Sequence, residues 1–146
     1  MPVIRPICPQ DEADWRRLWT GYLTFYQTSV PEAVYAATFA RLLSDDPAEF
    51  RGLVAEHEGR VVGLAHYLFH RHGWRQEKVV YLQDLYADPE MRGFGIGRAL
   101  IEAVYAEAAK ANAPKVYWVT DEGNATARQL YDRIAVKTAF IRYRRP

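Results

Sequence analysis

Residues 92–98 read Arg-Gly-Phe-Gly-Ile-Gly-Arg and join a strand-like run to a helix-like run. The preceding segment 79–87, with sequence VVYLQDLYA, is rich in β-branched and aromatic residues, which is typical of a strand. A helix that begins directly after a glycine-rich turn leaves its first N–H groups unpaired, and its dipole adds partial positive charge there. The stretch therefore predicts an anion site, which glycine opens to close approach by a phosphate. Apolar residues recur afterwards at the spacing of one helix face: Leu100, Ile101, Val104, Ala108 and Ala111.

Two common phosphate-binding motifs do not fit this turn. The dinucleotide fingerprint requires a third glycine three residues after the second, and counting from Gly93 and Gly95 that position is Arg98. The nucleotide P-loop ends in Gly-Lys-Ser/Thr, whereas residues 97–99 are Gly-Arg-Ala. The pattern that remains, Arg-x-x-Gly-x-Gly over residues 92–97, resembles the acyl-CoA pyrophosphate loop of the GNAT acetyltransferases.

Length and composition limit the class of protein. The 146 residues predict one domain, 1–146, that is long enough to bury a core. A net charge of +1 gives no indication of binding to nucleic acid or to a membrane, and no apolar run approaches the roughly 18 residues that span a bilayer. The N-terminus lacks a signal-peptide layout, and the single cysteine, Cys8, cannot form an internal disulfide. We therefore expect a cytoplasmic protein.

Periodicity along the chain predicts an α/β fold with the order β-α-α-β-β-β-α-β-α-β. The strand-helix-strand crossover from Val79 to Thr120 must be parallel, whereas a turn at Glu58-Gly59 indicates an antiparallel hairpin. We expect a single mixed sheet of six to seven strands with helices on both faces. The expected strands are 3–5, 53–55, 61–69, 79–87, 116–120 and 138–143.

The chain resembles the GNAT superfamily over essentially its full length. Segments 81–86 (YLQDLY) and 92–97 (RGFGIG) are very similar to the spermidine/spermine acetyltransferases. Segments 25–32 (FYQTSVPE) and 116–122 (VYWVTDE), with the tail 142–145, look more like the fungal Hpa-type acetyltransferases. Members of that branch act on histone lysines, polyamines or D-amino acids.

The resemblance implies a GNAT fold and an N-acetyltransferase that moves acetyl from acetyl-CoA to a primary amine by direct attack in a ternary complex, without a metal. It implies that Asn124 touches the pantetheine and that Tyr131 lies against the thioester sulfur. These two residues are seven apart, about two helical turns, so they share one helix face. The backbone of Leu85, Tyr86 and Ala87 would pair with the pantetheine. The implied pyrophosphate turn consists of Arg92, Gly93, Phe94, Gly95, Ile96, Gly97 and Arg98.

Each of these residues also has a purely structural interpretation. Tyr131 lies on an apolar stripe, where a tyrosine usually belongs to the core, although the motif favours a function. Asn124 is a good helix N-cap, and both roles are compatible. Arg92 and Arg98 can be surface charges, but their position beside a helix start favours phosphate pairing.

The general base is the weakest part of the prediction. A lysine-like amine costs roughly 4–5 kcal/mol to deprotonate at pH 7. The polyamine enzymes carry a glutamate where this chain has Gln83, whose amide cannot act as a base. Asp84 is next, but strand alternation points it to the opposite face, so a structural role stays open. Asp121 and Glu122 end the neighbouring strand and can act through water. The expected acceptor pocket is lined by Phe25, Tyr26 and Gln83.

The C-terminus departs from the family pattern. Acetyltransferases often have Gly-Phe or Gly-Tyr about four residues after the tyrosine, where this chain has Ala135-Val136. Only about ten residues follow, enough for one strand where two are usual, which leaves an open sheet edge. We therefore expect a homodimer in which the C-terminal strands contact or exchange.

Several alternatives remain open from the sequence. His66, His70 and His72 share one face by alternation, but without a clear fourth ligand they are expected in the substrate cleft or in solvent rather than around a metal. The acceptor can be a small-molecule amine such as a polyamine, an amino acid, or a protein lysine. The competing function is a non-catalytic CoA-binding module or sensor with the same fold.

Overall fold

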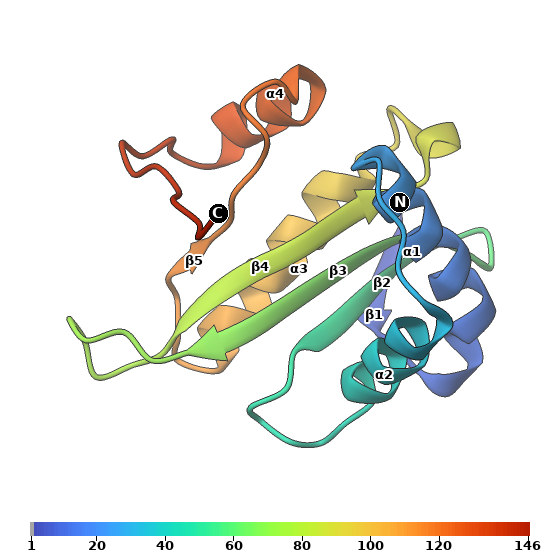
Figure 1. The fold of residues 1–146 in the computed structure, drawn as a ribbon, viewed down its shortest axis with the longest axis horizontal. Coiled ribbons are helices and arrows are strands. Elements are labelled where there is room, and N and C mark those ends of the chain that lie inside the picture. Colours follow the sequence, from blue (N-terminus) through green and yellow to red (C-terminus); the bar gives the residue numbers. More distant parts are fainter. Residues whose placement is uncertain (1) are drawn as a thin grey trace.

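One mixed β-sheet forms the centre of the molecule. The computed structural model describes residues 2–146, in which five strands lie in the order β1-β2-β3-β4-β5 (Figure 1). The first four are antiparallel neighbours, whereas β5 runs parallel to β4, as the crossover predicts. The strands are β1 (Val3–Pro6), β2 (Arg51–His57), β3 (Arg60–His70), β4 (Val79–Ala87) and β5 (Val116–Tyr117). The helices are α1 (Glu12–Phe25), α2 (Glu32–Leu42), α3 (Ile96–Lys110) and α4 (Ala125–Ile134), with 3-10 turns η1 (Pro9–Asp11) and η2 (Pro89–Met91).

Helices cover both faces of the sheet, as expected. On one face α1 and α2 bury Trp15 and Phe39 against Leu64 of β3. On the other face α3 buries Leu100 against strand residues that include Leu82 of β4. Because the central strands are covered on both sides, β3 is buried almost continuously from Val61 to Tyr67 instead of alternating. No helix within residues 2–146 combines the length and the apolar character needed to cross a lipid bilayer.

Gly63 of β3 brings α3 close to the sheet. A Cβ atom at this position would lie 2.6 Å from Cγ2 of Ile96 and 3.1 Å from Cδ1 of Leu100. Ile96 is the first residue of α3 and is itself only 2% exposed. The close contact therefore fixes where the helix begins, and with it the glycine-rich turn that precedes the helix.

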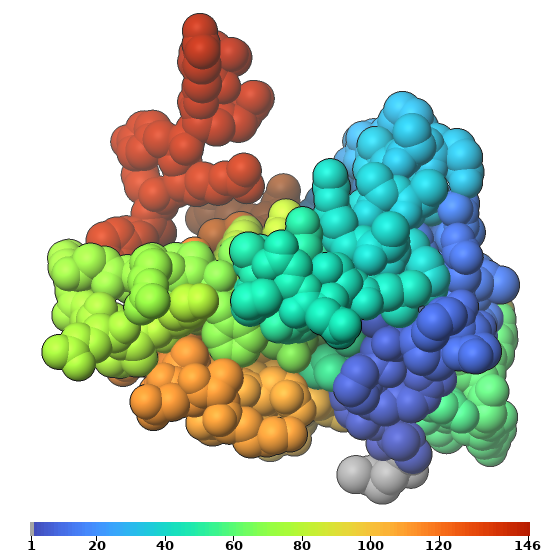
Figure 2. Space-filling view, turned by 90° about the horizontal axis from the view of Figure 1, so that it is seen from below, coloured from blue at the N-terminus to red at the C-terminus, as the bar shows by residue number. Residues whose placement is uncertain are grey.

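The C-terminal segment differs from the sequence prediction. The expected strand 138–143 does not form, so the sheet has five strands rather than six or seven within the described residues. Phe140, Ile141 and Tyr143 are 86%, 75% and 88% exposed, and Figure 2 shows this segment standing away from the rest of the molecule. A strand needs a neighbouring edge to pair with, and β5 pairs over only two residues rather than the expected 116–120. The short β5 is therefore not a long enough sheet edge for residues 138–143 to pair with.

Candidate active site

The parallel strands β4 and β5 separate after a very short contact. They pair only at Val80–Val116 and Tyr81–Tyr117. Farther along β4, the predicted pantetheine-binding residues 85–87 still pair with β3 on one side. On the other side they have no strand partner within the described residues, so backbone groups there are open to a ligand.

A bulge at Gln83 changes which way the residues of β4 face. His66 of β3 lies opposite Asp84 and Tyr67 lies opposite Leu82, so Gln83 is an extra residue without a partner in β3. Leu82 packs into the core beneath α3, yet Asp84, two residues later, accepts a hydrogen bond from Tyr22 of α1. Regular alternation would place both on one face. The alternation argument for Asp84 is therefore wrong, because Asp84 faces α1.

The glycine-rich turn has the geometry of an anion site. Gly93 and Gly95 have φ values of +85° and +71°, in the left-handed region that favours glycine, and Gly95 is the N-cap of α3. The N–H of Ala99 makes the first backbone bond of the helix, at 3.0 Å to the carbonyl of Gly95. The N–H groups of residues 96–98 before it have no partner of their own within the described chain and face outward at the positive end of the dipole.

The side chains of this turn are occupied in different ways. Phe94 packs against His57 with ring centroids 5.2 Å apart, and Ile96 is buried, so these two can contribute only main-chain groups to an anion. Arg98 donates to Glu102 at 2.8 Å on the exposed face of α3. Arg92 is exposed and forms no ion pair with any described residue, so it is the freer cation for a phosphate.

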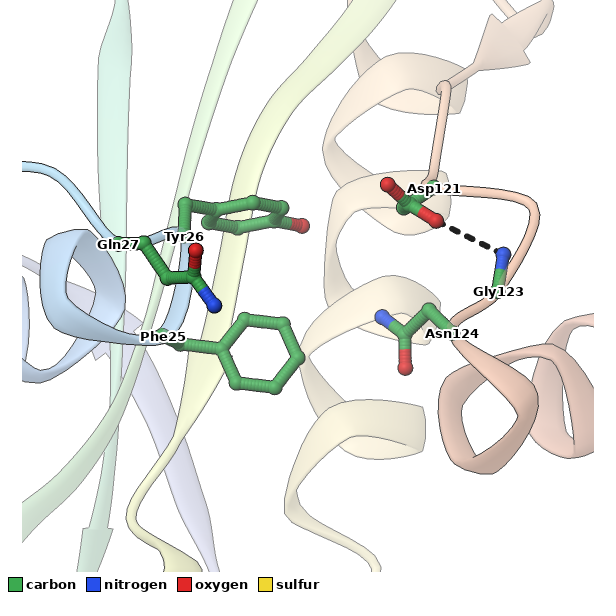
Figure 3. A pocket seen from close by; sticks show the side chains of 6 residues that line it. All are labelled: Phe25, Tyr26, Gln27, Asp121, Gly123 and Asn124. Atoms are coloured by element: carbon green, nitrogen blue, oxygen red, sulfur yellow. Dashed lines mark hydrogen bonds between the residues drawn. The ribbon is translucent and has the colours of Figure 1, made fainter.

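A cavity of about 330 Å³ lies between the end of α1 and the turn before α4 (Figure 3). The structure brings the predicted residues Phe25 and Tyr26 together here with Asp121 and Asn124, although these pairs are almost a hundred residues apart. Gln83 and Glu122 are exposed and are not among the residues that line it. The sequence analysis missed two lining residues, Gln27 and Gly123.

Asn124 and Tyr131 both belong to the α4 region. Asn124 is the N-cap of α4, as expected, and its side-chain oxygen accepts from the N–H of Ala127 at 3.4 Å. Tyr131 is half-buried, with its ring 5.4 Å from that of Trp118. Burial, together with the neighbouring Tyr26, raises the pKa of Tyr131 to about 12. Its hydroxyl therefore keeps its proton at neutral pH and can donate a hydrogen bond.

Two carboxylates act on the side of the cavity that α1 forms. Burial raises the pKa of Tyr26, and so do the charges of Asp84 and Asp121. Burial also raises the pKa of Tyr22, assisted by its hydrogen bond to Asp84. No lysine or arginine lines the cavity. These aromatic hydroxyls therefore stay protonated beside two carboxylates.

The three histidines do not form a common site. His66 is 2% exposed, so the expectation of a cleft or solvent position is wrong for it; its ring bonds to Trp15 and Asp84. His70 bonds to the hydroxyl of Tyr117 at 2.8 Å, and His72 accepts from the N–H of Trp74. Within residues 2–146 no group of three or more potential ligands is placed to hold a metal ion.

Residues 14–135 match the model of the acetyltransferase (GNAT) family, which covers most of the chain. The chain belongs to the GNAT acetyltransferase family. It is also similar to the D-amino-acid N-acetyltransferase HPA3 of Saccharomyces cerevisiae, with 42% identity over 144 residues, 98% of this chain and 89% of that protein.

Solved structures share the fold of this GNAT protein. The ribosomal-protein-alanine N-acetyltransferase from Brucella melitensis biovar Abortus 2308 superposes with a TM-score of 0.82 at 23% identity, covering 100% of this chain and 99% of that one. The aminoglycoside N-acetyltransferase AAC(6')-Iy in complex with CoA gives a TM-score of 0.85 at 19% identity, covering 100% and 95%. At these identities the likeness establishes the fold alone.

As a GNAT acetyltransferase, the protein transfers the acetyl group of acetyl-CoA to an amine. None of these relatives supports the alternative of a non-catalytic module. The residues present fit coenzyme A, because a Cβ added at Gly93 or Gly95 would meet no atom within 4 Å, which leaves the turn open in front of the unpaired N–H groups. When bound, acetyl-CoA supplies the acetyl group as an activated thioester.

Gln27 occupies a position in the GNAT cavity that glycine would fill with less backbone strain. Its φ is +57°, and the N–H of Thr28 after it donates to the carbonyl of Leu23 at 2.9 Å, a helix-ending motif that favours glycine at position 27. We expect Gln27→Gly to stabilise the fold by about 0.5–1 kcal/mol and to raise the Tm by about 2–3 °C in a thermal melt.

The same substitution removes a side chain that lines the cavity, so kcat/KM for the acceptor should fall. Glu58→Gly is the matched control, because Glu58 also has a positive φ, +50°, but lies in the β2–β3 turn away from the cavity. It should gain stability without a loss of kcat/KM. A lower Tm for Gln27→Gly would contradict this interpretation of the helix end.

Proposed function

We propose that the cavity at the end of α1 receives a primary amine and that the gap between β4 and β5 receives acetyl-CoA. The observation that carries the proposal is the separation of these strands after two paired positions, which leaves an open backbone edge beside the cavity. The glycine-rich turn lies beyond the far end of the same strand. An extended ligand along the edge therefore connects an anion site to the amine cavity.

The predicted cofactor-binding residues and Tyr131 each receive a role in this proposal. Residues 85–87 pair with the pantetheine through their backbone, and residues 92–98 hold the pyrophosphate through main-chain N–H groups and Arg92. Asn124 contacts the pantetheine while it caps α4. Tyr131 donates a hydrogen bond to the sulfur as it leaves, since its raised pKa keeps the hydroxyl protonated.

Asp121 is the better candidate for accepting the amine's proton through water. It lines the cavity, whereas Glu122 is exposed outside the lining and offers its carbonyl to Arg128 at 2.8 Å. One oxygen of Asp121 accepts the N–H of Gly123 at 2.8 Å, which fixes the carboxylate at the cavity rim (Figure 3). If this role is right, Asp121→Asn lowers the rate at neutral pH and Glu122→Gln does not.

The acceptor is best sought among small amines. The relative HPA3 is named for acetylation of D-amino acids, and the cavity of about 330 Å³ is of a size for small molecules. The test is release of free thiol from acetyl-CoA with a panel of D-amino acids, L-amino acids, polyamines and a lysine peptide. We expect turnover with at least one small amine, and thiol release with none of the panel would refute the proposal.

The pH dependence follows from the two groups that must hold opposite protonation states. The amine must be neutral, so kcat/KM for the acceptor should rise about tenfold per pH unit below the pKa of the amine. Tyr131 must be protonated, and its pKa of about 12 lies above the ordinary value of 10, so its loss falls at higher pH. We therefore expect no decline in kcat/KM up to about pH 10 in initial-rate measurements; a decline that begins near pH 8–9 would contradict the assignment.

We also propose a cytoplasmic homodimer that uses the C-terminal segment. Its exposed apolar residues Phe140, Ile141 and Tyr143 lack an edge to pair with in their own chain, and a second copy can supply one. Sedimentation at micromolar concentration should give a particle of twice the 16.8 kDa chain mass. A monomer under those conditions would rule the dimer out.

A further inference from the structure

A buried chain of hydrogen bonds connects α1 to Asp84 of β4. The indole N–H of Trp15 donates to Nε2 of His66 at 3.0 Å, and Nδ1 of His66 lies 3.0 Å from Oδ2 of Asp84. The hydroxyl of Tyr22 donates to Oδ1 of Asp84 at 2.7 Å. Trp15 and His66 are 0% and 2% exposed, so these bonds are shielded from water. We call these four residues the His66 network.

Trp15 determines which nitrogen of His66 carries the proton. An indole N–H can donate but cannot accept, so Nε2 of His66 must be the acceptor and carries no hydrogen. The proton of the neutral ring is therefore on Nδ1, where it points at Asp84. A second proton on Nε2 would set two donors against each other in a buried site. His66 thus presents a fixed N–H donor to Asp84.

Asp84 is a carboxylate without a cationic partner. It accepts one donor on each oxygen, so both oxygens have a hydrogen-bond partner within the protein. Its side chain is only 13% exposed, and within residues 2–146 no lysine or arginine lies within ion-pair distance of it. Charges with so little access to water are normally paired. A cation from outside the protein chain would therefore complete the pairing of this charge.

The charge of Asp84 acts on the acceptor cavity. Tyr26 lines the cavity and packs against Tyr22 of the network with ring centroids 5.0 Å apart. The charges of Asp84 and Asp121 both raise the pKa of Tyr26, so the tyrosine is within the field of both carboxylates. A cation that enters the cavity meets Asp121 among the lining residues, lies beside Tyr26 in the field of Asp84, and meets no lysine or arginine among the described residues of the lining.

We propose that Asp84 anchors the ammonium group of the acceptor and that His66 is a positioning residue that holds the Asp84 carboxylate in its orientation. This inference rests on the proposed N-acetyltransferase function and adds a determinant of its acceptor specificity. The anchored ammonium gives one proton to water before its lone pair forms the new bond, so Asp84 contributes affinity and selection for cationic amines.

The first test removes the charge and keeps the shape. Asp84→Asn should raise the acceptor KM at least tenfold and leave the acetyl-CoA KM within twofold, measured by thiol release. n-Butylamine, which is cationic at neutral pH, should compete with the acceptor less well in this variant, whereas n-butanol should compete equally in both proteins. An acceptor KM within twofold of the wild-type value would overturn the inference. So would a variant in which n-butylamine and n-butanol both lose inhibition to the same extent.

The second test separates positioning from packing at His66. The amide of an asparagine lies near the place of Nδ1 and keeps a donor to Asp84, whereas that of a glutamine lies near Nε2 and keeps a partner for Trp15. Each variant loses one of two buried hydrogen bonds, so their melting temperatures should be similar. We expect His66→Gln to raise the acceptor KM about tenfold and His66→Asn to stay within threefold.

Calorimetry with coenzyme A verifies that each variant is folded, because the proposed coenzyme site at residues 85–87 and 92–98 includes neither His66 nor Asp84. Equal effects of the two His66 variants on the acceptor KM would leave only a packing role and would overturn the positioning role. If the wild-type protein itself releases no thiol with any amine, the proposed function fails. A turnover-competent wild type with an unaffected Asp84→Asn variant refutes only this inference.

Discussion

Tyr131→Phe should lower kcat about 100-fold and change the KM for acetyl-CoA by less than threefold. The thiolate that leaves has an ordinary pKa near 8.5, whereas burial raises the pKa of Tyr131 to about 12. Full proton transfer from the tyrosine would cost about 5 kcal/mol, from a difference of about 3.5 units at 1.36 kcal/mol each. Tyr131 therefore acts mainly as a hydrogen-bond donor to developing charge, and removal of one such donor typically costs 100- to 1000-fold in rate.

Tyr105→Phe is the matched control for this substitution. Tyr105 of α3 also packs near Trp118, with ring centroids 6.3 Å apart, and its hydroxyl donates to the carbonyl of Ile134 at 3.3 Å. Loss of this bond should cost about 1 kcal/mol of folding stability without a change in kcat. Steady-state kinetics and thermal melts of both variants distinguish a catalytic role of the Tyr131 hydroxyl from a packing role. A large rise in KM with normal kcat for Tyr131→Phe would instead indicate a packing role.

Gly95→Ala should raise the KM for acetyl-CoA at least tenfold with little change in kcat. Gly95 has a φ of +71°, so alanine there strains the backbone by about 1 kcal/mol, and the new methyl group intrudes where a phosphate would meet the N–H groups of α3. A Cβ at this position meets no protein atom within 4 Å, so a loss of binding would not be due to a clash within the protein. Calorimetric titration with coenzyme A measures the affinity directly.

Gly59→Ala isolates the backbone effect. Gly59 has nearly the same φ, +77°, and also has no atom within 4 Å of an added Cβ, but it lies in the turn between β2 and β3. Both variants should therefore lose similar stability, about 1 kcal/mol, and only Gly95→Ala should lose affinity for coenzyme A. Equal affinities for the two variants would argue against a pyrophosphate at the glycine-rich turn.

Local patterns predicted most of the fold because they depend on residues close together in the chain. The Glu58-Gly59 turn, the start of α3 after Gly95 and the Asn124 cap each follow from short-range backbone chemistry. The parallel placement of β5 follows equally from the helix that separates it from β4. The glycine-rich turn could thus be located from the sequence, whereas its placement against the sheet also depends on the contact of Ile96 with Gly63 of β3.

The features that sequence patterns missed depend on pairing between distant segments. The bulge at Gln83 exists only in relation to β3, so strand alternation predicted the wrong face for Asp84. His66 has the alternation of a cleft residue, but side chains from distant segments, Trp15 and Trp19 of α1 and Phe50 before β2, cover its ring. The absent strand at 138–143 has a suitable apolar pattern, but a pattern cannot show whether an edge is available. The sequence did not predict Gln27 as a cavity residue, because its positive φ depends on where α1 ends.

The two-position contact between β4 and β5 has a consequence for the cohesion of the enzyme. No residue of α4 is fully buried, so the last quarter of the chain is held to the sheet by that contact and by partly covered side chains. A ligand that spans the gap joins both halves and acts as a substitute strand. We expect coenzyme A to raise the resistance of this quarter to proteolysis more than that of the remainder, because binding to the folded form alone adds stability in proportion to the logarithm of ligand concentration. The cosubstrate would then also stabilise the fold of the enzyme that uses it.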